Sequence, residues 1–112
     1  MMASDIKNEF KTLNLPTKGA SQIIDLTGQV QEFLSSIKAH QGIVNVSVVG
    51  STAGITTMEY EPGLVKDIPE MLDKLAPEGR YHHDDTWHDG NGHSHLRSAL
   101  MGMPFRLLNF SL

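Results

Sequence analysis

The most regular pattern of hydrophobic and polar positions lies between residues 43 and 49. Val44, Val46 and Val48 fall on one side of an extended chain and alternate with polar residues, so this segment is predicted to be a strand with one buried face. Shorter alternating or apolar runs predict four more strands, over residues 11–15, 21–26, 55–59 and 104–112.

Two stretches have the three- and four-residue spacing of an amphipathic helix. The first ends near Lys38, and either Asp25 or Thr27 is suited to cap its start. The second follows a Glu-Pro-Gly sequence and runs over about residues 61–75. Pro69 lacks a backbone N–H, so a kink is expected within this second helix.

Residues 80–95 show no hydrophobic period and are predicted to form a loop, followed by a short helical turn over 96–101. This segment holds five of the six histidines and three aspartates. In an extended chain His93 and His95 point to the same side, and His83 or Asp89 would supply a third ligand. Three protein ligands with an open position are typical of catalytic zinc.

Two other interpretations of the same residues stay open. Arg80 and Arg97 beside the histidines would suit a phosphate or other anion, and a solvated turn over 89–92 would need no ligand at all. The Gly-Ser-Thr-Ala-Gly sequence at 50–54 could bind a phosphate through its amides and hydroxyls, or be a plain turn. Glu59 is a candidate proton shuttle or ligand, or an ordinary surface residue.

Composition narrows the function classes. The chain has 112 residues, 39% hydrophobic and 20% charged, with a formal net charge of −4, which argues against a nucleic-acid partner. Cysteine is absent, which excludes disulfides, thiolate metal sites and a cysteine nucleophile. No window is apolar enough for a membrane span and the start of the chain has no signal-like segment. We therefore expect one cytoplasmic domain over residues 1–112.

Several segments, in order, resemble the YjbQ-like family. They are GSTAGITT (50–57), EYEPGL (59–64), LAP (75–77), YHHD (81–84) and DGNGHSHLRSAL (89–100). The resemblance implies an α+β fold, a β-sandwich with two main helices, assembled as a homotrimer. Some members are described as secondary thiamine-phosphate synthases, which join a pyrimidine pyrophosphate to a thiazole phosphate and release pyrophosphate. The expected ligand is therefore a phosphorylated small molecule or a phosphate-like anion.

The resemblance also implies a set of site residues. The catalytic residues would be Glu59, His83, His95 and Arg97. Ser51, Thr52 and Asn91 would bind substrate. A divalent metal, with zinc expected, would be held by His83, Asp89, His93 and His95.

The sequence departs from the family pattern after residue 102. A Gly-Thr-Trp-Gln-type segment on a final hairpin is absent here, so the chain is expected to lack that hairpin. This favours an alternative function, a metal- or anion-binding trimer without turnover. A metal-dependent hydrolase, in which zinc-bound water attacks a phosphoester, is a third hypothesis.

Overall fold

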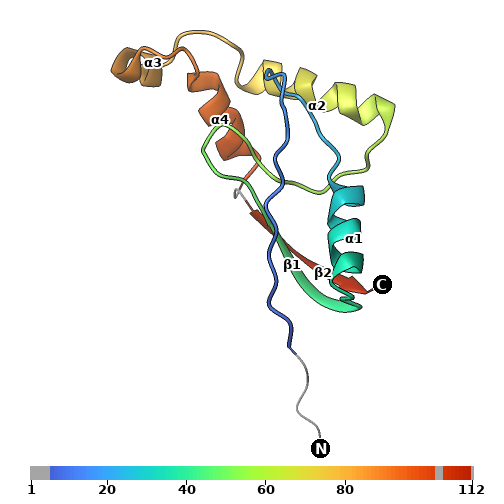
Figure 1. The fold of residues 1–112 in the computed structure, drawn as a ribbon. Coiled ribbons are helices and arrows are strands. Elements are labelled where there is room, and N and C mark those ends of the chain that lie inside the picture. The colour runs from blue at the N-terminus through green and yellow to red at the C-terminus, as the bar shows by residue number, and fades with distance from the viewer. Residues whose placement is uncertain (1–5, 103–104, 112) are drawn as a thin grey trace, which may run out of the picture. The chain divides into compact units, whose positions relative to one another are not determined.

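The computed structural model describes residues 6–102 and 105–111 (Figure 1). In chain order its elements are α1 (Thr27–Ser36), β1 (Gln41–Ser47), α2 (Pro62–Leu75), α3 (His82–Trp87), α4 (Gly92–Leu100) and β2 (Phe105–Ser111). Helices combined with a small sheet confirm the predicted α+β class. None of the helices in the described part of the chain has the length and apolar character needed to cross a membrane.

The chain divides into two compact units. One consists of residues 1–42 together with 109–112, and the other is Ile43–Leu108. All the residues of the candidate site described below belong to the second unit, so the site is built within one unit. A single domain over residues 1–112 stays a prediction.

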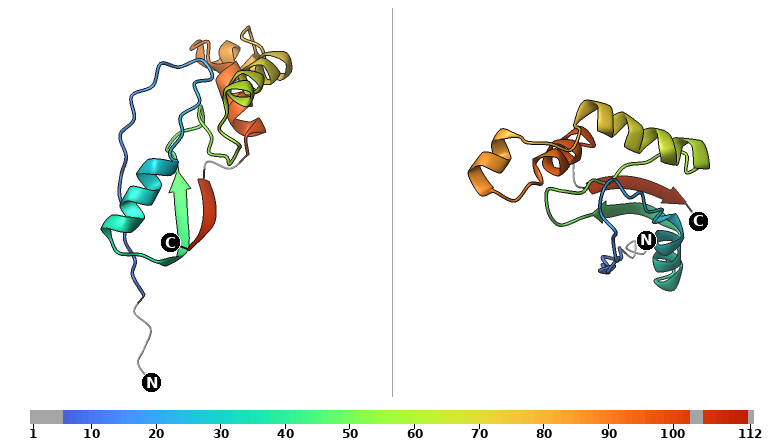
Figure 2. Two further views of the ribbon diagram at one scale, coloured as in Figure 1. Left: turned by 90° about the vertical axis from the view of Figure 1, so that its right-hand side faces the viewer. Right: turned by 90° about the horizontal axis from the view of Figure 1, so that it is seen from above.

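The sheet consists of β1 and β2, which pair in antiparallel directions (Figures 1 and 2). Val44, Val46 and Val48 are half-buried and the residues between them are exposed, which confirms the predicted alternation, although β1 begins at Gln41 and ends at Ser47. β2 confirms the expected C-terminal strand over its described residues, and positions 104 and 112 of that prediction lie outside them.

The strands predicted at 11–15, 21–26 and 55–59 are wrong, because none of these segments is a strand in the structure. An alternating sequence supplies two faces, but a strand also needs a neighbour that pairs with its N–H and C=O groups. Within the described ranges the sheet has two strands, so these residues do not form the β-sandwich that the resemblance implies.

Helices α1 and α2 form where the apolar spacing predicts them. In α1, Leu34 is buried, and the N–H of Thr27 donates to Asp25 Oδ1 over 2.9 Å. The Thr27 side chain first, and this backbone bond second, lower the pKa of Asp25 below its usual value. The Glu61 carboxylate caps α2 by accepting from the N–H of Gly63 (2.8 Å) and from that of Leu64. Helix α2 is continuous through Pro69 and buries Leu72.

The loop predicted over residues 80–95 is also wrong, because it contains α3 and the first turn of α4. Helix α3 has six residues, which is too short for a hydrophobic period to show. It ends at Trp87, and the next residue, His88, has a left-handed backbone with φ of 58°. The start of α3 is therefore marked by a polar contact, from the Asp84 carboxylate back to the N–H of Tyr81, rather than by an apolar stripe.

Candidate functional site

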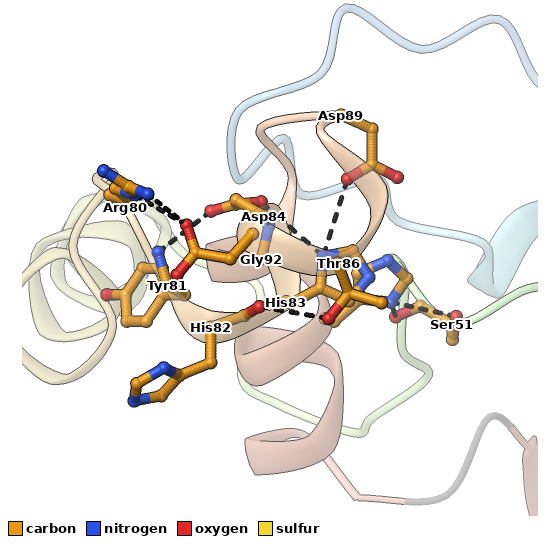
Figure 3. A network of polar contacts seen from close by, with 11 residues as sticks. Ser51, Arg80, Tyr81, His82, His83, Asp84, Thr86, Asp89 and Gly92 are labelled. Atoms are coloured by element: carbon orange, nitrogen blue, oxygen red, sulfur yellow. Dashed lines mark hydrogen bonds and ion pairs between the residues drawn. The ribbon is translucent and has the colours of Figure 1, made fainter.

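Asp84 holds the starts of α3 and α4 together. Its Oδ2 accepts from the N–H of Tyr81 and its Oδ1 accepts from the N–H of Gly92, each over 3.0 Å (Figure 3). A side chain at Gly92 would meet this carboxylate at 3.1 Å and the Tyr81 Cβ at 3.0 Å, so the close approach requires glycine. The Asp84 side chain is only 11% exposed.

These backbone donors also set the charge state of Asp84. The hydrogen bond from Tyr81 N–H is the largest cause that lowers the pKa of this carboxyl below its usual value, and the hydrogen bond from Gly92 N–H and the nearby His83 side chain act in the same direction. Partial burial opposes them. The side chain is accordingly a carboxylate at neutral pH.

His83 lies between two carboxylates. Its Nδ1 is 3.5 Å from Asp84 Oδ1 and 3.5 Å from Asp89 Oδ1, and Figure 3 shows Asp89 reaching toward it. Both separations are longer than a good N–H···O hydrogen bond. The Nδ1 atom is buried and has no hydrogen-bond partner in the described part of the chain. A buried polar atom without a partner requires an explanation.

The spacing around His83 suits a metal ion. Two ligand atoms at roughly 2.1 Å from a tetrahedral zinc are about 3.4 Å apart, close to both nitrogen–oxygen separations seen here. One ligand atom from each of His83, Asp84 and Asp89 can be chosen so that all three lie within 4.8 Å of one another. An imidazole with two carboxylates is a donor set that zinc uses.

Asn91 lies beside one of these carboxylates, Asp89. With its amide nitrogen turned toward Asp89, Asn91 donates to Asp89 Oδ1 over 2.9 Å. The carbonyl of Asn91 accepts from the N–H of Ser94, so the same residue also starts α4. In that orientation Asn91 contacts Asp89, a candidate metal ligand, whereas the family resemblance implies that Asn91 binds substrate.

His95 packs against His83. The two imidazole ring centroids are 4.4 Å apart and the rings are tilted by 43°. His95 Nδ1 is 3.0 Å from both the hydroxyl and the carbonyl oxygen of Ser51, so this nitrogen faces the turn at 50–54. His95 joins the site through its ring, and its Nδ1 is directed at Ser51.

The turn that carries Ser51 is fixed along α4. One turn of the helix beyond His95, the Ser98 hydroxyl donates to the carbonyl of Ala53. Farther along, a Cβ at Gly54 would lie only 2.9 Å from the Cβ of Met101, so glycine permits this contact. The three contacts place the turn on one face of α4.

The other predicted site residues are not brought to the His83 cluster. His93 is on α4 and its Nδ1 is buried without a hydrogen-bond partner in the described ranges, but it is not among the clustered ligand atoms. Glu59 and Thr52 are exposed, and neither side chain has a hydrogen bond or ion pair with another described residue. The sequence thus predicted His83 and Asp89 together, and the structure adds Asp84.

Arg97 is held at the end of α2. Its Nε donates to the carbonyl of Ala76, and a terminal nitrogen forms an ion pair with Asp73, each over 2.9 Å. The Arg97 side chain is 11% exposed and Ala76 is 2% exposed. These contacts tie α4 to the C-terminal end of α2, where a cation is favourable.

Replacing Arg97 by alanine is expected to destabilise the fold by about 1–3 kcal/mol, because it removes a charged donor from a buried carbonyl. Asp73→Asn breaks only the ion pair with a 68% exposed carboxylate and should cost below about 1 kcal/mol. Urea denaturation of both variants measures the difference. Equal, small losses would show that the Ala76 contact contributes little.

Asp84 is the residue that the sequence interpretation missed. Its position three residues after Tyr81 is the spacing at which a side chain can bond back to the residue before a helix. That signal has meaning only if a helix begins at His82, and the histidine-rich segment had been interpreted as a loop.

Comparisons with a family model and with individual proteins agree on one family. Residues 11–108 match the model of the family described as UPF0047 protein YjbQ-like. A UPF0047 protein of Archaeoglobus fulgidus is 36% identical over 91 residues, which cover 80% of this chain and 68% of that protein. The UPF0047 protein YugU of Bacillus subtilis is 31% identical and covers 83% of this chain and 70% of its own length.

Solved structures agree with these matches. A hypothetical protein from Aeropyrum pernix is 34% identical with a TM-score of 0.70, covering 79% of this chain and 64% of that one. A YjbQ/UPF0047 family protein from Clostridium acetobutylicum is 30% identical with a TM-score of 0.74. This match covers 87% of this chain and 73% of that one. The chain thus spans about two thirds of the length of these relatives.

Proposed function

The chain belongs to the YjbQ-like UPF0047 family, a family of uncharacterised function, and from this premise we propose that the α3–α4 junction is a metal site that binds a phosphorylated small molecule. The observation that supports this most is the buried Nδ1 of His83, which lacks a hydrogen-bond partner in the described residues and lies 3.5 Å from two carboxylate oxygens. A divalent cation would give this nitrogen and both carboxylates a shared partner.

The proposed ligands are His83, Asp84 and Asp89, with zinc as the ion. Asp84 can bind the ion and still accept from the two backbone N–H groups. Each of its carboxylate oxygens has two lone pairs and uses one of them for a backbone N–H bond. Asn91 would hold the Asp89 carboxylate in place, as outer residues do around metal ligands. A zinc ion with an open position can bind phosphate oxygens or activate water.

Phosphate recognition is assigned to the turn over residues 50–54. Its backbone N–H groups have no acceptor among the described residues, and Ser51 and Thr52 are exposed. Successive free amides in a turn attract anions. Ser51 also contacts His95, which packs on His83, so the turn and the proposed zinc ligands are neighbours.

The reaction we propose is thiamine-phosphate synthesis, in which a pyrimidine pyrophosphate and a thiazole phosphate are joined with release of pyrophosphate. His83 and His95 would orient the pyrophosphate, and the 50–54 turn would offset its charge. Glu59 remains the candidate proton shuttle. Arg97 has no such role in this proposal, because its guanidinium is bound at the end of α2.

We also propose that the protein is a cytoplasmic homotrimer. The sheet has two strands and both of its edges lack a partner strand within the described residues, while Ile43 and Leu107 on those strands are more than 60% exposed. Isolated two-stranded sheets are at best marginally stable, and unpaired edges favour association. Three is the number of chains that the family resemblance implies, so the expected solution mass is that of three chains.

The activity is tested by mixing the two phosphorylated precursors with zinc-loaded protein and measuring thiamine phosphate. Asp89→Asn should abolish product, and His82→Asn should not, because His82 is exposed and outside the cluster. Bound zinc without product would support the alternative of a binding protein without turnover. Equal product from the Asp89 variant would contradict the assignment of the site.

A further inference from the structure

Asn91 and Gly92 are the one Asn-Gly sequence in the chain, and they lie at the start of α4. A Cβ at position 92 would lie only 3.1 Å from the Asp84 carboxylate and 3.0 Å from Tyr81 Cβ, so the packing requires glycine. Glycine also leaves its backbone nitrogen without a side chain to shield it from the amide of the preceding asparagine. Asparagine is a thermolabile residue, and the packing at the α3–α4 junction thus places one where its amide is most easily attacked.

We propose that Asn91 is a latent site of deamidation, which the Asp84 carboxylate keeps unreactive in the folded chain. In this reaction the backbone nitrogen of Gly92 forms a bond to Asn91 Cγ, and the bond from Cγ to the amide nitrogen breaks. The amide nitrogen leaves as ammonia, with the electron pair of the broken bond and the proton that the Gly92 nitrogen gives up. Water then opens the imide ring and leaves aspartate or isoaspartate at position 91.

The peptide group between Asn91 and Gly92 is held at both ends. Its N–H donates to Asp84 Oδ1 over 3.0 Å, and its carbonyl accepts from the N–H groups of Ser94 (2.9 Å) and His95 (3.3 Å). With ψ of 18° at Asn91, the Gly92 nitrogen is nearly eclipsed with the Asn91 nitrogen rather than with Cβ. Attack on Cγ requires the peptide group to rotate until nitrogen and carbon are aligned, so these hydrogen bonds must break first.

The bond to Asp84 is the one that makes this site different from an ordinary helix start. The first N–H groups of a helix have no partner within the helix, and here a carboxylate that is only 11% exposed supplies one. Hydrogen bonds to a charged acceptor are stronger than those between neutral groups. The population of the rotated, reactive peptide is therefore set mainly by Asp84.

Deamidation would change the contact between Asn91 and Asp89. The Asn91 amide nitrogen, turned toward Asp89, donates to its Oδ1 over 2.9 Å. A carboxylate at position 91 has no proton to donate and would place a second negative charge beside Asp89. Isoaspartate would in addition lengthen the backbone where α4 begins. The modification is thus expected to loosen the α3–α4 junction, and it needs no bound metal.

The proposal is tested by incubating the full chain with a chelator at neutral pH and measuring conversion of the Asn91 amide to an acid by peptide mass spectrometry. In Asp84→Ala the rate should rise about tenfold or more, the factor that one hydrogen bond to a charged group represents. Asp85→Ala is the matched control, because it removes the neighbouring carboxylate of α3 and leaves the Asp84–Gly92 bond intact. Equal rates in the two variants would overturn the proposal.

Hydrogen exchange of the Gly92 N–H gives a second measurement, in the unaltered chain alone. Low concentrations of guanidinium chloride should raise the exchange rate of this N–H and the deamidation rate of Asn91 in the same proportion, because both require the bond to Asp84 to open. Deamidation that is already as fast in the folded chain as in the fully unfolded chain, or that does not follow Gly92 exchange, would contradict the role of Asp84. This comparison decides the matter if Asp84→Ala does not fold.

Discussion

His83→Ala is expected to weaken zinc binding by at least about a hundredfold, because it removes the only nitrogen in the proposed cluster. Loss of residues that merely support metal ligands costs about 10–100-fold, and loss of a ligand should cost more. Isothermal titration of chelator-treated protein with zinc measures the effect.

His82→Ala is the matched control for this measurement. His82 is the neighbouring residue of α3, carries the same ring, and is exposed outside the cluster, so its loss should leave the affinity unchanged. Asp89→Asn should weaken binding as His83→Ala does. If His93→Ala abolished binding and His83→Ala did not, the metal would be held by α4 and the proposed cluster would be wrong.

Asp84→Ala is expected to lower the melting temperature by several degrees, independently of any metal. The substitution leaves the N–H groups of Tyr81 and Gly92 without their acceptor and removes the link between the starts of α3 and α4. Thermal unfolding in the presence of a chelator measures this effect. Asp85→Ala is the control, because among residues 6–102 and 105–111 that carboxylate pairs only with the exposed Arg80, and its loss should cost below about 1 kcal/mol.

The pH dependence of stability should identify the same carboxylate. The folded-state pKa of Asp84 is lowered. The contribution of Asp84 to the free energy of unfolding is therefore fully present above its unfolded-state pKa, and is lost as the pH falls through its folded-state pKa. The difference in melting temperature between the unaltered chain and Asp84→Ala should therefore be constant near neutrality and shrink below about pH 4. A difference that persists unchanged in acid would contradict this account.

Elements with a buried face could be predicted from the sequence. The valines of β1 recur every second residue and the apolar residues of α1 every three or four, as a strand and a helix require. The structure places both elements as expected. The segments at 11–15 and 55–59 carry a similar pattern but no strand pairs with them in the structure, because pairing depends on residues distant in the sequence.

The candidate site could be predicted in part. The residue types indicated a histidine–carboxylate cluster, and His83 and Asp89 do lie together. The role of Asp84 depends on α3, whose start follows from a polar cap rather than from hydrophobicity. The sequence also grouped Arg97 with the histidines by proximity along the chain. On a helix, however, neighbouring residues face different directions, and the guanidinium reaches the end of α2 instead.

The most direct test is a crystal of zinc-soaked protein with diffraction collected at the zinc absorption edge. We expect one anomalous peak per chain in the described site, about 2.0–2.2 Å from His83 Nδ1 and from a carboxylate oxygen of Asp84 and of Asp89. A peak on other histidines with none at His83, or no peak at all, would contradict a metal centre at the α3–α4 junction.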